Sequence, residues 1–192
     1  METNVKLIDY GFFSHDGIKF EYHVSGNENG EPPVLLNGNG GDYRGFEGEL
    51  YKPLSEHFKI IRFSTRGTGR TDLGNKKLTF ELFSDDLKAL LDFLGAKPVN
   101  ICGFSDGGNL GMVFAVTYPD YVKRLAVFGS NLNTRGTKTG DQLGIIKDHR
   151  IYAIKAFLTK DPEWKRRCWI EGMMVGQPHL NYKKLSTLKI PF

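Results

Sequence analysis

Short apolar runs alternate along this chain with segments whose apolar residues recur at helical spacing. The two opening runs flank Asp16-Gly17, a turn signal that predicts a β-hairpin. The runs that predict strands are residues 6–14, 18–24, 33–36, 59–63, 98–102 and 124–128. The segments that predict helices are residues 45–58, 79–94 and 107–118. Strands that alternate with helices predict an α/β fold, with a mostly parallel sheet covered on both faces.

The predicted helices differ in how strongly the pattern supports them. Residues 79–94 carry six apolar residues at helical spacing, with Thr79 suited to the amino-terminal end and Gly95 to the carboxyl-terminal end. The helix predicted over residues 45–58 is supported only by the spacing of Phe46, Leu50 and Leu54. The alternation stops after Asn131, and residues 141–185 are helical and amphipathic in places.

The amino-acid composition is typical of a globular protein. The chain has 192 residues, of which 40% are hydrophobic and 25% charged, as expected of one globular domain. Two cysteines, Cys102 and Cys168, are too few for a disulfide framework or a cysteine metal cluster, and we expect reduced thiols. The opening residues lack the pattern of a secretory signal, and no run of about 18 apolar residues occurs. We therefore expect a cytoplasmic protein with no membrane partner.

Charge divides the chain into an acidic and a basic part. Residues 1–120 carry 12 basic and 17 acidic side chains, whereas residues 121–192 carry 14 and 5. A basic half is compatible with nucleic-acid binding. Its cations are scattered, however, and match no nucleic-acid-binding motif, so a solvated helical face is the favoured interpretation. We expect no nucleic-acid partner.

The sequence Gly103-Phe104-Ser105-Asp106-Gly107 fits the pattern G-x-S-x-G. The bare pattern is weak, because an ordinary glycine-rich turn can also match it. Here it follows an apolar strand and opens a helix, which is the setting of a nucleophile elbow. Such a turn exposes the serine hydroxyl beside the helix amino terminus, where free N–H groups and the helix dipole can stabilise an oxyanion.

At this point the chain resembles the α/β-hydrolase fold family. Five segments match family motifs in order along the chain: residues 34–41 the oxyanion loop, 66–71 the loop after the fourth strand, 85–95 the next helix, 101–109 the elbow, and 118–125 the approach to the sixth strand. The resemblance implies an α/β-hydrolase core over residues 1–133 and a helical cap or lid-like segment over 134–186. Residues 187–192 resemble the approach to the seventh strand, so we expect a fold that lacks the last two strands.

The resemblance also implies roles for individual residues. Ser105 would be the nucleophile, and the backbone N–H groups of Asn39 and Asp106 would form the oxyanion hole. Two departures from the family occur, since Asn37 stands where histidine is usual and Ser64 where aspartate is common. Both are expected to loosen the mouth of the site. We expect no cofactor and no metal.

A serine nucleophile needs a base and a group that orients the base. The resemblance places the acid after the seventh strand and the histidine after the eighth, beyond Phe192. Of the five histidines, His15, His23 and His57 precede the elbow and are expected at the surface. The other two, His149 and His179, fall in the cap-like region, where His179 could face the site. We expect the triad to be incomplete.

Two hypotheses therefore stay open. The first is a serine hydrolase that cleaves an ester or similar acyl bond of a small substrate through Ser105. The second is a catalytically incomplete fragment or pseudoenzyme that keeps the fold. In either case, residues 124–128 would form an exposed sheet edge, which we expect a second copy of the chain or a rearranged 141–192 segment to cover.

Overall fold

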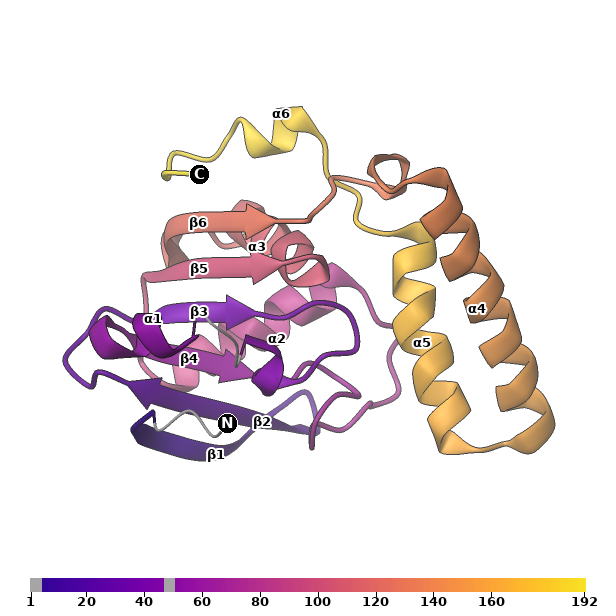
Figure 1. The fold of residues 1–192 in the computed structure, drawn as a ribbon, viewed down its shortest axis with the longest axis horizontal. Coiled ribbons are helices and arrows are strands. Elements are labelled where there is room, and N and C mark those ends of the chain that lie inside the picture. Colours follow the sequence, from indigo (N-terminus) through magenta and orange to yellow (C-terminus); the bar gives the residue numbers. More distant parts are fainter. Residues whose placement is uncertain (1–4, 47–50) are drawn as a thin grey trace.

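Residues 5–46 and 51–192 are described by a computed structural model, and within them six strands form one sheet (Figure 1). The strands are β1 (Leu7–His15), β2 (Ile18–Gly26), β3 (Pro33–Leu36), β4 (Lys59–Phe63), β5 (Val99–Phe104) and β6 (Val122–Phe128), in the spatial order β1-β2-β4-β3-β5-β6. The β1–β2 and β2–β4 pairs are antiparallel, and the other pairs are parallel. The predicted hairpin and mostly parallel sheet are confirmed.

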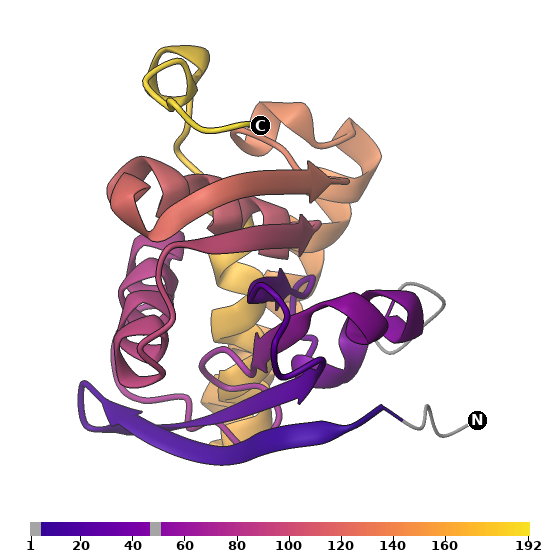
Figure 2. The same ribbon diagram turned by 90° about the vertical axis from the view of Figure 1, so that its left-hand side faces the viewer.

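Helices cover both faces of the sheet, as predicted (Figure 2). The α-helices are α1 (Tyr51–His57), α2 (Phe80–Phe93), α3 (Asp106–Thr117), α4 (Thr139–Thr159), α5 (Pro162–Gly176) and α6 (Tyr182–Leu185). The described residues also form the short 3-10 helices η1 (Tyr43–Phe46), η2 (Pro119–Tyr121) and η3 (Thr134–Gly136). α1 packs on one face over a small cluster around Leu35, Tyr51 and Ile60. α2 and α3 pack on the other face over the main core.

The predicted helix over residues 45–58 is found only in part. The chain forms η1 up to Phe46 and α1 from Tyr51, and Leu50 lies outside the described residues. The prediction for residues 79–94 is closer. Thr79 caps α2 by accepting a hydrogen bond from the Leu82 N–H through its side chain, which satisfies one free donor of the first turn.

A hairpin of α4 and α5 stands at the carboxyl ends of the parallel strands (Figure 1). α5 lies on the inner side and contributes Ile170 and Met173 to the main core, whereas α4 packs against α5 and has no buried residue. The arrangement places helices where the loops after β3 and β5 emerge. In open α/β sheets, ligands usually bind at the carboxyl ends of the strands, at the point where the strand order reverses.

The sixth strand is one edge of the sheet, as expected. One backbone bond reaches it from the carboxyl-terminal segment, where the Leu125 N–H donates to the Pro191 carbonyl at 3.0 Å. Leu188 and Ile190 pack against the main core from the same segment. A segment of residues 141–192 therefore contacts this edge, and coverage by a second copy stays a prediction.

Candidate active site

Ser105 occupies the sharp turn between β5 and α3. Its backbone angles are φ 53° and ψ −123°, a left-handed conformation that costs energy for any residue with a side chain. The Ser105 N–H donates to the Phe128 carbonyl at 2.9 Å, and its carbonyl accepts from Gly108 and Asn109. Neighbouring backbone thus holds the strained residue in place, which is the geometry of a nucleophile elbow.

The glycines around Ser105 are required by close backbone approach. A Cβ on Gly107 would lie 2.0 Å from the Leu36 carbonyl oxygen, and one on Gly103 would lie 2.4 Å from the Gly107 oxygen. Neither position has room for a side chain without a shift of backbone. The first and last residues of the G-x-S-x-G pattern therefore let β5, α3 and the end of β3 come together.

The loop after β3 lies beside the turn. A Cβ built on Gly38 would be 3.5 Å from the Ser105 Cβ, so the next residue, Asn39, begins near the serine. The Asn39 side chain donates from Nδ2 to Glu171 Oε2 on α5 at 3.3 Å. Among the described residues, neither the Asn39 nor the Asp106 backbone N–H has a backbone acceptor. Both predicted oxyanion-hole donors are thus available at this edge.

The two departures from the family pattern are both held by hydrogen bonds. Asn37 donates from Nδ2 to the Asp42 carbonyl at 2.7 Å, which closes the loop after β3 on itself. The Ser64 hydroxyl donates to Glu21 Oε2 at 3.1 Å, and the same carboxylate oxygen accepts from the Arg70 N–H at 2.9 Å. These bonds argue against the expected loosening of the mouth, since each substituted side chain has a buried or half-buried partner.

A cavity of about 390 Å³ opens beside Ser105, under the start of α4 and the end of α5. Polar groups dominate its lining, and two side chains, Lys138 and Asp141, bring charge from the cap-like segment. The lining residues are Ser105, Asp106, Gly129, Ser130, Asn131, Gly136, Thr137, Lys138, Asp141, Ile145, Met174 and Gln177. This volume suits a small molecule.

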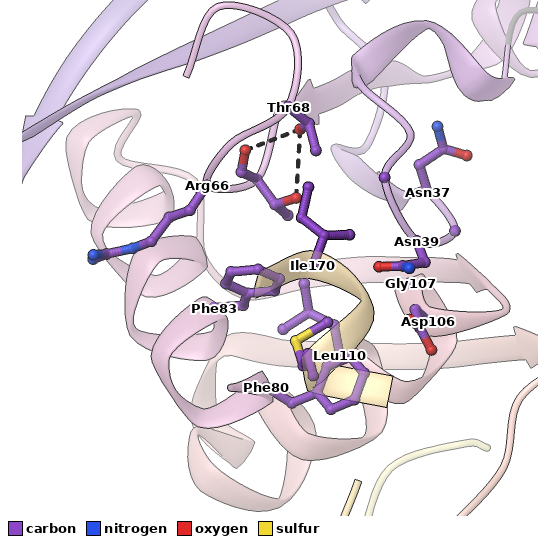
Figure 3. Close-up of a pocket in the computed structure, with 14 residues that line it drawn as sticks. Asn37, Asn39, Arg66, Thr68, Phe80, Phe83, Asp106, Gly107, Leu110 and Ile170 are labelled. Atoms are coloured by element: carbon purple, nitrogen blue, oxygen red, sulfur yellow. Dashed lines mark hydrogen bonds between the residues drawn. The ribbon is translucent and has the colours of Figure 1, made fainter. Parts of the chain in front are cut away.

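A second, smaller cavity of about 20 Å³ lies behind the loop after β3 (Figure 3). Phe80, Phe83, Leu110 and Ile170 close its apolar end, whereas Asn39 and Asp106 lie on the opposite side. The volume fits about one water molecule. This smaller cavity is therefore too small for an organic substrate.

Asp106 is the most perturbed acid at the site. Its side chain turns along α3, where Oδ1 accepts from Asn109 Nδ2 at 2.9 Å. Burial raises the pKa of this carboxyl to about 6, and the negative charge of Glu171 adds to the rise. Burial likewise raises the pKa of Glu171, with a further contribution from Asp148. Two carboxyl groups that resist ionisation thus flank the predicted oxyanion hole.

None of the five histidines, all of which lie in the described ranges, lines the Ser105 cavity. His179 is exposed, and His149 points to the other side of α5, where its Nδ1 lies 3.0 Å from the Cys168 carbonyl oxygen. The expectation that His23 lies at the surface is wrong. Its ring is half-buried and stacks on Tyr43 at a centroid distance of 3.6 Å.

Several residues of the site could not be identified from the sequence. Glu171 lies 132 residues from Asn39 in the sequence, and Lys138 and Asp141 stand in a stretch without a motif. Ser130 supports the turn by donating from its hydroxyl to the Ser105 carbonyl at 3.0 Å. Only the position of Ser130, directly after a predicted strand, could have indicated it.

Metal-ligand clusters and membrane-spanning helices are both absent from the part of the chain that the structure describes. Residues 5–46 and 51–192 contain no group of three or more histidine, cysteine, aspartate or glutamate side chains placed to hold a metal ion. In the same ranges, every helix is too short or too polar to cross a membrane.

Comparison with known proteins agrees with this geometry. A family model described as alpha/beta hydrolase fold matches residues 32–149. A Caulobacter segnis protein with the provisional name carbamate hydrolase RutD is 31% identical over 117 residues, which cover 58% of this chain and 42% of that protein. The human serine hydrolase BPHL is 28% identical over 120 residues, 60% of this chain and 41% of that protein. The matched segment thus spans less than half of each relative.

Solved structures show the same fold over more of the chain. The alpha/beta hydrolase MGS-M2, from a deep-sea metagenome library, superposes with a TM-score of 0.78 at 18% identity, covering 94% of this chain and 77% of that one. The enol-lactonase from Burkholderia xenovorans gives a TM-score of 0.73 at 20% identity, with coverage of 94% and 78%.

Proposed function

Because this chain belongs to the α/β hydrolase fold family, we propose that it is a serine hydrolase of a small acyl substrate. Ser105 would attack the carbonyl carbon of an ester or similar bond. The observation that carries the proposal is the strained Ser105 backbone at the β5–α3 turn, beside a cavity of about 390 Å³. Strain of this kind is characteristic of functional positions.

Backbone donors would stabilise the intermediate. When Ser105 Oγ bonds to the acyl carbon, the carbonyl oxygen becomes an oxyanion, and the N–H groups of Asn39 and Asp106 would donate to it. The amino terminus of α3 adds a favourable dipole at the same place. An oxyanion-hole donor is worth about 100- to 1,000-fold in rate in other enzymes, so this part alone could support some reaction.

The names of similar proteins support the same bond class. A carbamate hydrolase, an enol-lactonase and a pyrrolizixenacetamide deacetylase are among them, and each name denotes cleavage of an acyl carbon–heteroatom bond. The polar lining, with Lys138 and Asp141, supports a small polar substrate over a long apolar acyl chain.

The second candidate is an incomplete hydrolase, which the absence of any histidine from the cavity favours. Without a base, the Ser105 proton has no acceptor, and the hydroxyl is a poor nucleophile. The fold and the oxyanion donors would be kept, but turnover would be slow.

Reaction of Ser105 with a fluorophosphonate probe tests the proposal. We expect stoichiometric labelling of the chain at Ser105, found by peptide mass spectrometry, and its loss in Ser105→Ala. A Thr137→Val variant is the matched control and should still be labelled, because it removes another hydroxyl that lines the same cavity. Labelling that survives Ser105→Ala would overturn the assignment.

Rescue by free imidazole separates the two candidates. If the base is missing, added imidazole should increase the rate at which the native chain hydrolyses p-nitrophenyl acetate. The rate with Ser105→Ala and the same imidazole measures the background, and the native rate should exceed it. A complete hydrolase would turn over without imidazole. Labelling of Ser105 without turnover, restored by imidazole, would favour the incomplete form.

A further inference from the structure

The outward side of α4 is an exposed apolar and cationic surface. At about 3.6 residues per turn, seven exposed side chains fall within about one third of the helix circumference. This outer α4 face consists of Leu143, Lys147, Arg150, Ile151, Ile154, Phe157 and Leu158. Its apolar members are 36% to 81% exposed, the highest being Phe157. The face contains no acidic residue, since Asp141 and Asp148 lie outside it.

The opposite side of α4 accounts for its packing. Tyr152 stacks on Trp164 of α5 at a centroid distance of 5.7 Å, and His149 reaches the Cys168 carbonyl. Figure 1 shows α5 between α4 and the sheet, so the outer α4 face points away from the rest of the molecule. Within residues 5–46 and 51–192, this face therefore stays exposed, with five apolar side chains in a row.

We propose that the outer α4 face binds the surface of an anionic lipid bilayer. The inference does not depend on the proposed hydrolase activity. Interfacial helices combine apolar side chains that enter the acyl boundary with lysine and arginine that meet anionic headgroups. The face between Leu143 and Leu158 has both in one stripe about 23 Å long. The proposal departs from the expectation of no membrane partner, which rested on the lack of a membrane-spanning run, because contact with a bilayer surface needs no such run.

Charge argues against a second copy as the occupant. In a two-fold antiparallel pairing, the middle of the face meets itself, so Arg150 would lie against Arg150 of the other copy. Lys147 would add two further cations to that interface. No carboxylate on the face compensates them, and like charges in a desolvated interface oppose association.

A protein groove is also a poor match. Lys147 and Arg150 lie among the apolar residues of the stripe, so a groove that buried Ile151 and Ile154 would bury these cations too. A bilayer surface avoids that cost, because the long aliphatic stems can follow the apolar residues while the charged ends reach the headgroups.

The hairpin tip places more cations beside the most exposed apolar residues. Lys155 follows Ile154, and its ammonium lies 3.9 Å from the centre of the Trp164 ring. Lys160 ends α4 with φ 54°, a left-handed position where glycine is favoured. A further cation thus lies at the hairpin tip, two residues after Leu158.

Vesicle flotation tests the proposal with the full chain. Vesicles of phosphatidylcholine alone and with phosphatidylglycerol are compared at low and high salt. We expect binding only to the anionic vesicles, weakened by salt because screening acts on the cationic contribution. Lys147→Gln/Arg150→Gln should weaken binding roughly thirtyfold. Phe157→Ser/Leu158→Ser should weaken it roughly tenfold or more.

Matched controls remove similar groups elsewhere. Lys183→Gln/Lys184→Gln removes the same charge from α6, and Tyr182→Ser removes an apolar side chain that is 83% exposed. Both should bind as the native chain does. All replaced side chains are exposed, and circular dichroism should confirm that each variant is folded.

Four results would overturn the proposal. They are no binding to anionic vesicles, equal loss in the α6 controls, a dimer that Phe157→Ser/Leu158→Ser dissolves, and binding to duplex DNA as tight as to vesicles and unchanged by the apolar pair. The last would mark a simple polyanion surface. None of these readouts uses Ser105, so they stand apart from the labelling experiment.

Discussion

Asp106 follows the predicted nucleophile and is nine-tenths buried, which couples its protonation to folding. Its pKa is raised from the ordinary 3.8 to about 6. A group with a raised folded pKa binds its proton more tightly in the native state. Its stabilising contribution is therefore complete below pH about 4 and is lost as the pH rises through about 6.

Asp106→Asn should remove this pH dependence. At pH 7.5 the amide avoids the burial of a charge and can still accept from Asn109, so we expect the free energy of unfolding to rise by up to about 3 kcal/mol. At pH 4 the variant and the native chain should differ little. Urea unfolding at both pH values measures the change.

The control for Asp106 is Asp141→Asn, which replaces an exposed carboxyl of the same cavity. Its stability should follow the native pH profile. A variant Asp106→Asn that is no more stable than the native chain at pH 7.5 would show that the carboxylate is well solvated there.

Gly107→Ala should destabilise the protein, by about 3 kcal/mol or more, because its Cβ would meet the Leu36 carbonyl at 2.0 Å. Gly144→Ala is the control, since nothing lies within 4 Å of a Cβ there and alanine is the better helix former. We expect that control to gain roughly 0.5–1 kcal/mol. Thermal unfolding of the pair measures both, and equal effects would contradict the tight elbow.

At the scale of elements, a buried ion pair joins the loop after β4 to α2. Arg66 donates from Nε and Nη2 to both carboxylate oxygens of Asp86 at 2.7 Å, and both side chains are almost fully buried. Arg66 also reaches Asp16 of the β1–β2 turn at 3.0 Å. A single guanidinium thus connects three elements that are far apart in the sequence.

Asp86→Ala should cost about 3–5 kcal/mol, because it leaves a buried cation with one partner fewer. Asp92→Ala on the same helix is the control. Asp92 is exposed enough for solvent to screen its bonds to Lys88 and Lys97, so we expect a loss of at most about 1 kcal/mol. Chemical unfolding of both variants measures the two losses of stability. If Asp86→Ala loses no more free energy of unfolding than Asp92→Ala, burial does not strengthen the Arg66–Asp86 pair.

At the scale of the molecule, the β6 edge bears on oligomeric state. The expected homo-oligomer would cover this edge, yet a backbone bond from Pro191 to Leu125 already contacts it. We expect this contact to be enough, so that the chain is monomeric by light scattering. Deletion of Pro191 and Phe192, which removes the carbonyl that accepts from the Leu125 N–H, should then promote association. A native dimer whose β6 amides resist hydrogen exchange would instead support the second copy.

Local pattern predicted most of the core, since strands and helices are specified by spacing within a few residues. The G-x-S-x-G turn and the Thr79 cap are of this kind. The pattern failed where distant contacts decide. Gly45 and Phe46 belong to a 3-10 helix instead of the expected α-helix, His23 is half-buried by stacking on Tyr43, and Glu171 reaches Asn39 only once α5 is folded against the sheet.

The position of α5 has a mechanical consequence. Three hydrogen bonds fasten this segment to the sheet edge: Arg166 Nη1 to the Gly67 carbonyl at 3.0 Å, Asn39 Nδ2 to Glu171 at 3.3 Å, and the Phe80 N–H to Gln177 Oε1 at 2.9 Å. They lie near its start, middle and end, so the helix can neither tilt nor slide without breaking at least one. Because Asn39 bonds to Glu171, we expect a shift of α5 to move the loop that carries Asn39 as well.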